Sequence, residues 1–363
     1  MPICHFVRNS MSRATLPIAL VASACGGGAG GGPGIDAATG PLETLHYVGR
    51  FDLSDPSAAV FEWSGSAIWT RFSGTTITAE LGGSANDFEV EIDGARQPVI
   101  MHLGGDHSYV LASGLAAGEH DLKLTRRTEA FFSTSTFQGF TGATLVETPP
   151  PARLIEFIGD SITCGYGITG DGPGCHFSHD TEAEADAYGA LTAAQLGASH
   201  HAICWSGIGV YRNYADGAGM VMPQRYGLIT PNEDSRPWSF SATPQVVVMN
   251  LGTNDFSPDS NSVPVDPGQN FVDAFTAFVA QVRGRYPSVP FVLTTSPLLG
   301  DPQHATHKTY LETVAASDPH TVVLDLAVQD PADGYGCDYH PSPITAQKMA
   351  DRVKSQLHTL LGW

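Results

Sequence analysis

The sequence of 363 residues predicts an α/β protein in two parts, a β-sandwich of jelly-roll type followed by a doubly wound, mostly parallel sheet. Three observations predict this fold. Short strand-like segments separated by turn residues fill the first third of the chain, a run of prolines follows at 149–151, and apolar strands then alternate with amphipathic helices. We therefore expect a leader and glycine-rich tether over residues 1–40, the β-sandwich over 41–148 and the α/β domain over 152–363.

The first 40 residues have the pattern of a targeting segment. Arg8 and Arg13 precede an apolar stretch over 14–24, which leads to Cys25 and a flexible glycine-rich tract. A basic start, a short apolar run and small residues before a cleavage point are typical of a secretory signal. Residues 22–25, Ala-Ser-Ala-Cys, resemble a bacterial lipobox. We expect export, either as a lipoprotein anchored through Cys25 or, after ordinary cleavage nearby, as a secreted protein.

The charge of the chain excludes two classes of partner. Lys and Arg number 18 and Asp and Glu number 37, so the formal net charge is −19. A nucleic-acid-binding protein needs a basic surface to neutralise phosphates, and docking on an anionic membrane needs a basic patch. We therefore expect no nucleic acid as a partner, and a membrane only through a lipid on Cys25.

The segment before the prolines is expected to contain only strands. Its strand-like runs are separated by turn residues such as Ser64-Gly65, Ser73-Gly74 and Asp93-Gly94, and no helical period interrupts them. The expected strands are Leu45–Phe51, Ala59–Trp63, Ala67–Phe72, Thr76–Leu81, Phe88–Ile92, Pro98–His102 and Asp121–Thr125. Strands at this spacing are typical of a β-sandwich of jelly-roll type.

After residue 152 the apolar pattern indicates alternating buried strands and helices. The expected strands are Leu154–Ile158, Ala202–Trp205, Val246–Leu251, Phe291–Thr295 and Val322–Leu326. One helix has its apolar residues on a single face, namely Phe271, Phe275, Phe278, Val279 and Val282. Another begins with Ser342 as N-cap and Pro343 as its first residue, and its apolar face is Met349, Val353, Leu357 and Leu360. Such sheets carry their sites at the carboxyl ends of the strands.

Four cysteines lie beyond the leader: Cys164, Cys175, Cys204 and Cys337. In an exported domain they can form two disulfides, with three possible pairings. None belongs to a C-x-x-C pair, so a structural zinc site is not expected. Two histidine pairs with i,i+3 spacing, His176/His179 and His304/His307, have no further ligand beside them, and we interpret them as exposed histidines of loops or helices. We expect no metal and no other cofactor.

Polar motifs follow several of the expected strands. Ser161 ends the sequence Gly159-Asp160-Ser161, Asn254 lies in Gly252-Thr253-Asn254-Asp255, and Asp338 stands two residues before His340. Each has an ordinary explanation, as a helix N-cap, a turn, or a capping or surface histidine. Together they supply a nucleophile, a base with an orienting acid and an oxyanion donor at one edge of a sheet. The G-x-S-x-G elbow of α/β-hydrolases is absent.

These motifs resemble the four blocks of the SGNH (GDSL-type) hydrolases: Gly159-Asp160-Ser161, Gly207 in Trp205-Ser206-Gly207, Asn254 with its neighbours, and Asp338 with His340. With a jelly roll before them, the segments 158–167, 205–214, 250–256 and 338–341 make the chain similar to carbohydrate esterase family 2 over nearly its whole length after the leader. The resemblance implies removal of O-acetyl groups from plant polysaccharides such as xylan or glucomannan, with a preference for 6-O-acetyl groups.

The resemblance also implies a role for each site residue. Ser161 would be the nucleophile and His340 the general base and then the general acid. The oxyanion hole would be the N–H groups of Ser161 and Gly207 with the side chain of Asn254, and Gly209 is a second candidate for the backbone donor. Tyr214 and Tyr339 stand where the family has aromatic sugar platforms, and the alternative for both is a half-buried core tyrosine.

The sequence departs from the wider SGNH pattern at the acid. That pattern has its acid three residues before the histidine, where this chain has Cys337, while Asp338 stands two residues before it. Two arrangements therefore remain open: a triad completed by Asp338, or a dyad in which a backbone carbonyl orients His340.

Two other functions stay open from the sequence. One is an SGNH esterase on another ester, such as the O-acetyl groups of bacterial cell wall. The other is a surface glycan-binding lipoprotein, although a pure binding protein has no need of Ser161, His340 and Asn254 at three strand ends. We expect a monomer whose partner is an acetylated polysaccharide or oligosaccharide.

Overall fold

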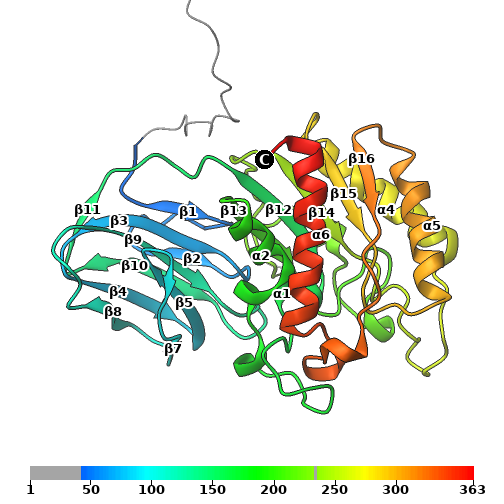
Figure 1. The fold of residues 1–363 in the computed structure, drawn as a ribbon, viewed down its shortest axis with the longest axis horizontal. Coiled ribbons are helices and arrows are strands. Elements are labelled where there is room, and N and C mark those ends of the chain that lie inside the picture. Colours follow the sequence, from blue (N-terminus) through cyan, green and yellow to red (C-terminus); the bar gives the residue numbers. More distant parts are fainter. Residues whose placement is uncertain (1–41, 233–234) are drawn as a thin grey trace, which may run out of the picture. The chain divides into compact units, whose positions relative to one another are not determined.

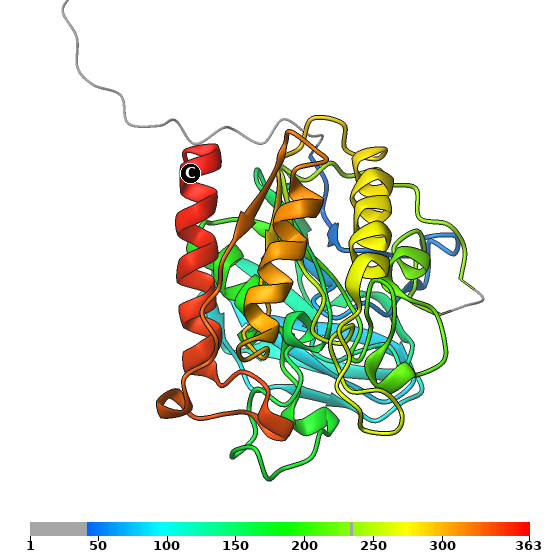
Figure 2. The same ribbon diagram turned by 90° about the vertical axis from the view of Figure 1, so that its right-hand side faces the viewer.

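The computed structural model describes residues 42–232 and 235–363 (Figures 1 and 2). The expected leader, with Cys25, lies outside the described residues. The described residues belong to one compact unit, in which antiparallel strands end at Val146 and a parallel sheet begins at Leu154. Within residues 42–232 and 235–363, no helix combines the length and the apolar character needed to cross a bilayer.

The N-terminal part consists of two antiparallel sheets. The larger has the order β1-β3-β9-β5-β6, with β11 beside β3 and β7 beside β5; these strands are β1 (His46–Val48), β3 (Ala67–Ser73), β5 (Asn86–Ile92), β6 (Ala95–Arg96), β7 (Ile100–His102), β9 (Glu119–Arg126) and β11 (Thr144–Val146). The smaller has the order β2-β10-β4-β8, from β2 (Ala59–Phe61), β4 (Thr76–Gly83), β8 (His107–Ser113) and β10 (Ser135–Thr141). Their inner faces enclose one apolar core, which confirms the expected β-sandwich.

Strands β8 and β10 are absent from the sequence expectation, as are the short strands β6 and β11, and for β10 a β-bulge explains the difference. Its register against β4 shifts between Phe137 and Gly139. The bulge inserts one residue, so the two aromatic residues Phe137 and Phe140 are three apart instead of an even number apart. Both still pack on the sandwich core. A search for strict alternation misses such a strand because its period changes in the middle.

The C-terminal part is a doubly wound parallel sheet with the order β13-β12-β14-β15-β16, which confirms the expected fold class (Figure 1). The strands are β12 (Leu154–Gly159), β13 (Ser199–Cys204), β14 (Val246–Asn250), β15 (Phe291–Thr294) and β16 (Thr321–Leu324). The helices are α1 (Ser161–Cys164), α2 (Tyr188–Gln195), α3 (Met222–Arg225), α4 (Gly268–Arg283), α5 (Gln303–Ala315) and α6 (Pro343–Leu361). Helices α2 and α6 cover one face of the sheet, and α4 and α5 cover the other.

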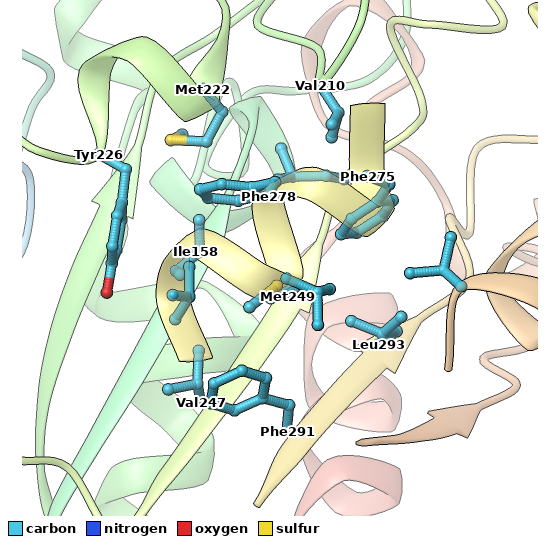
Figure 3. Close-up of a cluster of buried hydrophobic side chains, with 14 of the residues drawn as sticks. Ile158, Val210, Met222, Tyr226, Val247, Met249, Phe275, Phe278, Phe291 and Leu293 are labelled. Atoms are coloured by element: carbon cyan, nitrogen blue, oxygen red, sulfur yellow. The ribbon is translucent and has the colours of Figure 1, made fainter. Parts of the chain in front are cut away.

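Residues that alternate along the strands supply both apolar layers. Val247 and Met249 of β14 face α4, whose Phe275 and Phe278 lie over them in Figure 3. Val246 and Val248 face the opposite layer, with α6. Because a parallel sheet is covered on both faces, β14 is apolar at each position from Val246 to Met249, as expected. The capping prediction is also confirmed, since the Ser342 side chain accepts a hydrogen bond from the Thr345 N–H and Pro343 opens α6.

Three histidines correct the sequence interpretation. Strand β13 begins at Ser199, before the expected Ala202, and carries the buried residues His200 and His201. His200 pairs with the buried Glu184 at 2.7 Å, and His201 Nδ1 lies 3.7 Å from the buried Glu156, so each histidine has a carboxylate neighbour inside the protein. His307, expected to be exposed, is fully buried; its Nε2 lies 3.1 Å from the Leu251 carbonyl oxygen, and its Nδ1 accepts from the Ser296 N–H at 3.4 Å.

A buried arginine connects the β-sandwich to the α/β part. Arg50, which follows β1, is fully buried, and its Nη1 donates to the carbonyl oxygens of Tyr226 at 2.5 Å and Leu228 at 2.8 Å. Its guanidinium lies within 5.8 Å of four aromatic rings, those of Trp63, Tyr226, Trp238 and Phe240. The side chain therefore satisfies backbone carbonyls and fills a cage of rings at once.

Replacing Arg50 with alanine is expected to lower the free energy of unfolding by about 3 kcal/mol, because two buried carbonyl groups lose their donor and a cavity opens among the rings. Denaturant unfolding measures the change. The control is Arg71→Ala, which removes an exposed pair with Asp121 and should cost about 0.5 kcal/mol. Equal losses in the two variants would show that the buried cage contributes nothing of its own.

Candidate active site

A cavity of about 670 Å³ opens at the carboxyl ends of the parallel strands. Ser161 and His340 line it together with Gly207 and Asn254, so the structure brings together the residues singled out by all four sequence motifs. Apolar and aromatic residues complete the wall, among them Tyr166, Tyr214, Phe256, Leu298 and Leu299. The position agrees with the rule that open α/β sheets bind ligands at their carboxyl edge.

Ser161 is the first residue of α1, directly after β12. Asp160 caps this short helix, because its carboxylate accepts from the Ile162 N–H at 3.0 Å. Gly159 allows the helix to turn back onto the strand, since a Cβ there would lie 1.9 Å from Thr163 Oγ1. Each residue of the motif Gly159-Asp160-Ser161 thus has a local role: Gly159 permits the close turn, Asp160 caps the helix, and Ser161 places its hydroxyl at the cavity.

The Ser161 hydroxyl hydrogen-bonds His340 Nε2 at 2.9 Å. His340 Nδ1 donates to the Cys337 carbonyl oxygen at 3.3 Å, which leaves Nε2 as the acceptor. Burial lowers the pKa of His340 to about 4, so the imidazole is neutral at pH 7 and able to accept the serine proton. This pair has the geometry of a nucleophile with its general base.

Asp338 does not orient the His340 ring through its carboxylate. Its oxygens accept instead from the Tyr166 hydroxyl at 2.9 Å, from His176 Nδ1 at 3.0 Å and from the Phe177 N–H at 3.0 Å. Asp338 and Tyr339 both have a left-handed backbone, with φ of 51° and 63°, in a tight turn that leaves the Cys337 carbonyl on the imidazole. This arrangement corrects the triad expectation and matches the dyad alternative.

Tyr166 is a site residue that sequence reasoning missed. Its ring stacks on the His340 ring, with the centroids 4.0 Å apart, and on the Phe177 ring at 4.1 Å. Because the Tyr166 hydroxyl is bonded to Asp338, this carboxylate holds His340 indirectly, through the tyrosine. No motif spacing marks Tyr166, although the glycines on both sides of it, Gly165 and Gly167, are a weak signal of a special turn.

The two disulfides select one of the three possible pairings. Cys164 is joined to Cys204, and Cys175 to Cys337. The first ties the end of the Ser161 helix to the strand before Gly207. The second holds Cys337, whose carbonyl oxygen accepts from His340. Both covalent links therefore join chain segments that carry site residues.

The three residues predicted to donate to a developing oxyanion, Ser161, Gly207 and Asn254, all line the cavity. The N–H groups of Ser161 and Gly207 have no acceptor in the part of the chain that the structure describes. Asn254 Nδ2 donates to the Ile208 carbonyl oxygen at 2.8 Å and, in a longer contact, to Asp160 Oδ2 at 3.5 Å. The second candidate, Gly209, is corrected: its N–H donates to Asn213 Oδ1 at 3.1 Å and is already used.

Both tyrosines predicted as sugar platforms are surface residues. Tyr214 is 61% exposed and lines the cavity. Tyr339 is 62% exposed, stands outside the cavity lining and has its ring 5.5 Å from that of Tyr335. The alternative interpretation as core tyrosines is therefore wrong for both, and only Tyr214 borders the cavity directly.

Two clusters of side chains have the residue types of metal ligands. One is Asp87, His179 and Asp180, and the other is Glu129, Cys164 and Glu182. The sulfur of Cys164 belongs to a disulfide, so it offers no thiolate. Neither cluster lines the Ser161 cavity.

The acid limb of kcat/KM on an acetyl ester is expected near pH 4 to 5, because the free enzyme is active only while His340 is neutral and burial lowers its pKa to about 4. The rate should stay nearly constant between pH 8 and pH 6 and fall below that limb. Burial raises the pKa of the neighbouring Asp160 to about 7, so the profile should also be recorded with Asp160→Asn. An acid limb near 6.5 in both proteins would contradict the prediction.

Comparisons with known proteins agree on one family. Residues 47–150 match the model "Carbohydrate esterase 2 N-terminal", and residues 157–348 match the GDSL-like lipase/acylhydrolase family. A solved family two carbohydrate esterase from Clostridium thermocellum, in complex with cellohexaose, has a TM-score of 0.83 and 36% identity, and the match covers 88% of this chain and 99% of that one.

Two curated proteins are also similar. Cellulase/esterase CelE of Acetivibrio thermocellus is 38% identical over 87% of this chain, which spans 39% of the length of CelE. An acetylxylan esterase / glucomannan deacetylase of Cellvibrio japonicus is 28% identical, over 89% of this chain and 93% of that protein.

Proposed function

Because this chain belongs to carbohydrate esterase family 2, we propose that it removes O-acetyl groups from polysaccharides of the xylan or glucomannan type. The observation that carries the proposal is the 2.9 Å hydrogen bond between Ser161 Oγ and a neutral His340, at a cavity that also contains oxyanion donors. The names of the Cellvibrio japonicus relatives, acetylxylan esterase / glucomannan deacetylase, support this substrate class.

The reaction begins when Ser161 Oγ attacks the acetyl carbonyl carbon and His340 Nε2 takes the hydroxyl proton. The carbonyl oxygen becomes an oxyanion, which accepts hydrogen bonds from the N–H groups of Ser161 and Gly207 and from Asn254 Nδ2. His340 then gives its proton to the sugar oxygen, the C–O bond breaks and an acetyl-enzyme remains. Water, activated by the same imidazole, attacks the acetyl carbon, and acetate and free Ser161 result.

The Cys337 carbonyl keeps His340 in the required tautomer throughout the cycle. It accepts from Nδ1–H, and its partial negative charge stabilises the imidazolium that forms at each proton transfer. Tyr166 supports the ring from its face and is itself fixed by Asp338. Hydrogen bonds from His176 and Tyr166 keep the pKa of Asp338 low, although burial acts in the opposite direction, so this support is ionised at neutral pH.

The sugar chain is proposed to lie across the mouth of the cavity. Tyr214 offers an exposed ring at the cavity wall, and aromatic rings stack well on the apolar faces of sugars. The net charge of −19 favours neutral glycans over strongly anionic ones. A polysaccharide that carries acetyl groups on a neutral backbone suits both features.

Acetate release from acetylated glucomannan and acetylated xylan tests the proposal, with Ser161→Ala as the matched variant. We expect release by the unmodified enzyme from at least one substrate and none by the variant. If the unmodified enzyme releases no acetate from either but hydrolyses 4-nitrophenyl acetate, the substrate is another ester, such as a bacterial cell-wall O-acetyl group. If it also fails on 4-nitrophenyl acetate, a glycan-binding function replaces the esterase.

We also propose that the chain is exported, with Cys25 lipidated or with cleavage nearby. The two disulfides support an oxidising compartment, because disulfides persist outside the cytosol. Mass spectrometry of the mature N-terminus distinguishes a diacylglyceryl Cys25 from a free amino terminus, and a mature protein that begins at Met1 or Met11 would overturn the proposal.

A further inference from the structure

A pair of buried glutamates, Glu129 and Glu182, lies beside the loop of residues 205–209 that carries the Gly207 N–H, which we call the oxyanion loop, and the reaction described above does not use the pair. Glu129 is 1% exposed and belongs to the segment between β9 and β10 of the sandwich, whereas Glu182 is fully buried and precedes α2. Such carboxyl groups are rarely buried without a specific partner. Their surroundings therefore indicate what the pair holds in place.

Glu129 holds Ser206, the residue before Gly207, with both carboxylate oxygens. One oxygen accepts from the Ser206 N–H at 2.6 Å, and the other accepts from the Ser206 hydroxyl in a short hydrogen bond. Gly207 follows with a left-handed φ of 78°, and its N–H is one of the proposed oxyanion donors. A bidentate contact of this kind fixes both the backbone and the side-chain rotamer of Ser206.

Glu182 completes the arrangement from the α/β part. Its Oε2 accepts from the Glu129 N–H at 3.1 Å, while its Oε1 is buried without a partner among the described residues. Burial, and then the charge of Glu129, raise the pKa of Glu182 well above its usual range, which favours its protonated form. A proton shared between the two carboxyl groups would give Glu182 Oε1 a partner.

The segment that carries Glu129 is itself rigid. Arg126, the last residue of β9, is fully buried and donates to the carbonyl oxygens of Thr128 at 3.0 Å, Glu129 at 3.0 Å and Ser133 at 2.8 Å. These hydrogen bonds hold residues 128–133 against the end of strand β9. A carboxylate on such a support can position a loop of the neighbouring sheet to the accuracy that catalysis needs.

Among the described residues, the other contacts of this loop involve the residues on either side of Ser206, including a hydrogen bond from the Ile208 N–H to the Trp205 carbonyl oxygen at 3.3 Å. Before it, Cys204 is bonded to Cys164; after it, the Gly207 carbonyl accepts from the Tyr214 N–H at 2.8 Å and the Ile208 carbonyl accepts from Asn254. The Ser206 N–H has Glu129 as its acceptor. Without Glu129, this N–H would lose its acceptor, and the turn that carries the Gly207 N–H would be held by the flanking contacts alone.

We propose that Glu129, in its pair with Glu182, is a positioning residue for the oxyanion hole. The β-sandwich is then part of the catalytic apparatus, because it supplies the group that aims the Gly207 N–H at the developing oxyanion. This inference rests on the proposed function, since an oxyanion hole has a role only in acyl transfer.

The test compares kcat and KM for 4-nitrophenyl acetate in Glu129 variants of the full chain. Glu129→Ala is expected to lower kcat by about 10–100-fold, which is no more than the usual effect of removing an oxyanion donor outright. KM should stay nearly unchanged, because the oxyanion exists only in the transition state. Glu129→Gln is isosteric, and its amide oxygen still accepts from the Ser206 N–H. It should stay within about threefold of the unmodified enzyme.

Glu62→Ala is the matched control, because Glu62 is also a buried glutamate of the sandwich and accepts hydrogen bonds from Thr134 at 2.6 Å and Asn232 at 2.5 Å. It should lower the unfolding temperature and leave kcat unchanged. If Glu129→Ala does not fold, Glu129→Asp replaces it, since the shorter side chain keeps the charge and withdraws from Ser206.

The rates of these variants support or overturn the inference as follows. A selective loss of kcat in Glu129→Ala or Glu129→Asp, recovered in Glu129→Gln, supports the inference. A kcat loss no larger than in Glu62→Ala, or equal losses in Glu129→Ala and Glu129→Gln, overturns it. If Ser161→Ala keeps the activity of the unmodified enzyme, the proposed function fails instead, independently of the Glu129 series.

Discussion

Replacing His340 with alanine is expected to lower kcat on an acetyl ester by about 10²–10⁴-fold, whereas Asp338→Asn should lower it only about fivefold. His340 is hydrogen-bonded to the Ser161 hydroxyl, so its loss removes the general base from both halves of the reaction. Asp338 touches neither Ser161 nor the His340 ring through its carboxylate and acts only through Tyr166. An asparagine at 338 still offers one oxygen to the tyrosine hydroxyl.

Steady-state rates on 4-nitrophenyl acetate measure both variants, with circular dichroism to compare their folded fractions. His176→Ala is the matched control, because it removes an exposed partner of Asp338 and leaves Tyr166 in place. Equal losses in His340→Ala and Asp338→Asn would show that the carboxylate orients the imidazole directly during turnover, and the dyad would be excluded.

Replacing Asn254 with alanine is expected to lower kcat by about 10²–10³-fold, with a small change in KM, which is the usual effect of losing one oxyanion donor. The side chain is buried at the cavity wall, and its Nδ2 also donates to the Ile208 carbonyl oxygen at 2.8 Å. The variant therefore loses a donor and one attachment of the loop that carries Gly207. Both effects act on the transition state rather than on the bound ester.

The rate of Ser161 phosphorylation by diethyl 4-nitrophenyl phosphate should fall in parallel, because that reaction also develops negative charge on an oxygen in the same position. Asn270→Ala is the control: Asn270 is exposed, donates to the Tyr211 hydroxyl at 3.2 Å and lies outside the cavity lining. A KM increase at constant kcat in Asn254→Ala would instead assign Asn254 to substrate binding.

Local patterns in the sequence were sufficient for most of the fold. Buried strands such as 246–250 and the apolar face of α4 follow directly from hydrophobic periodicity, and Ser342 with Pro343 marks the start of α6. Two of the missed features, in β10 and β13, have structural causes. Strand β10 contains a bulge that changes its period, and the start of β13 is polar because His200 finds its partner in Glu184.

The sequence by itself determined the chemistry of this protein: a serine, an asparagine and a histidine at the carboxyl ends of parallel strands, in the order of one hydrolase family. Only the tertiary structure decided how they are held. In the structure the Cys337 carbonyl oxygen, rather than the Asp338 carboxylate, accepts from the imidazole of His340. The Tyr166 ring stacks on that imidazole, and Glu129 of the sandwich binds Ser206 of the oxyanion loop. The physical reason is that these contacts join residues far apart in the chain through left-handed turns and buried pairs, and no local spacing encodes such contacts.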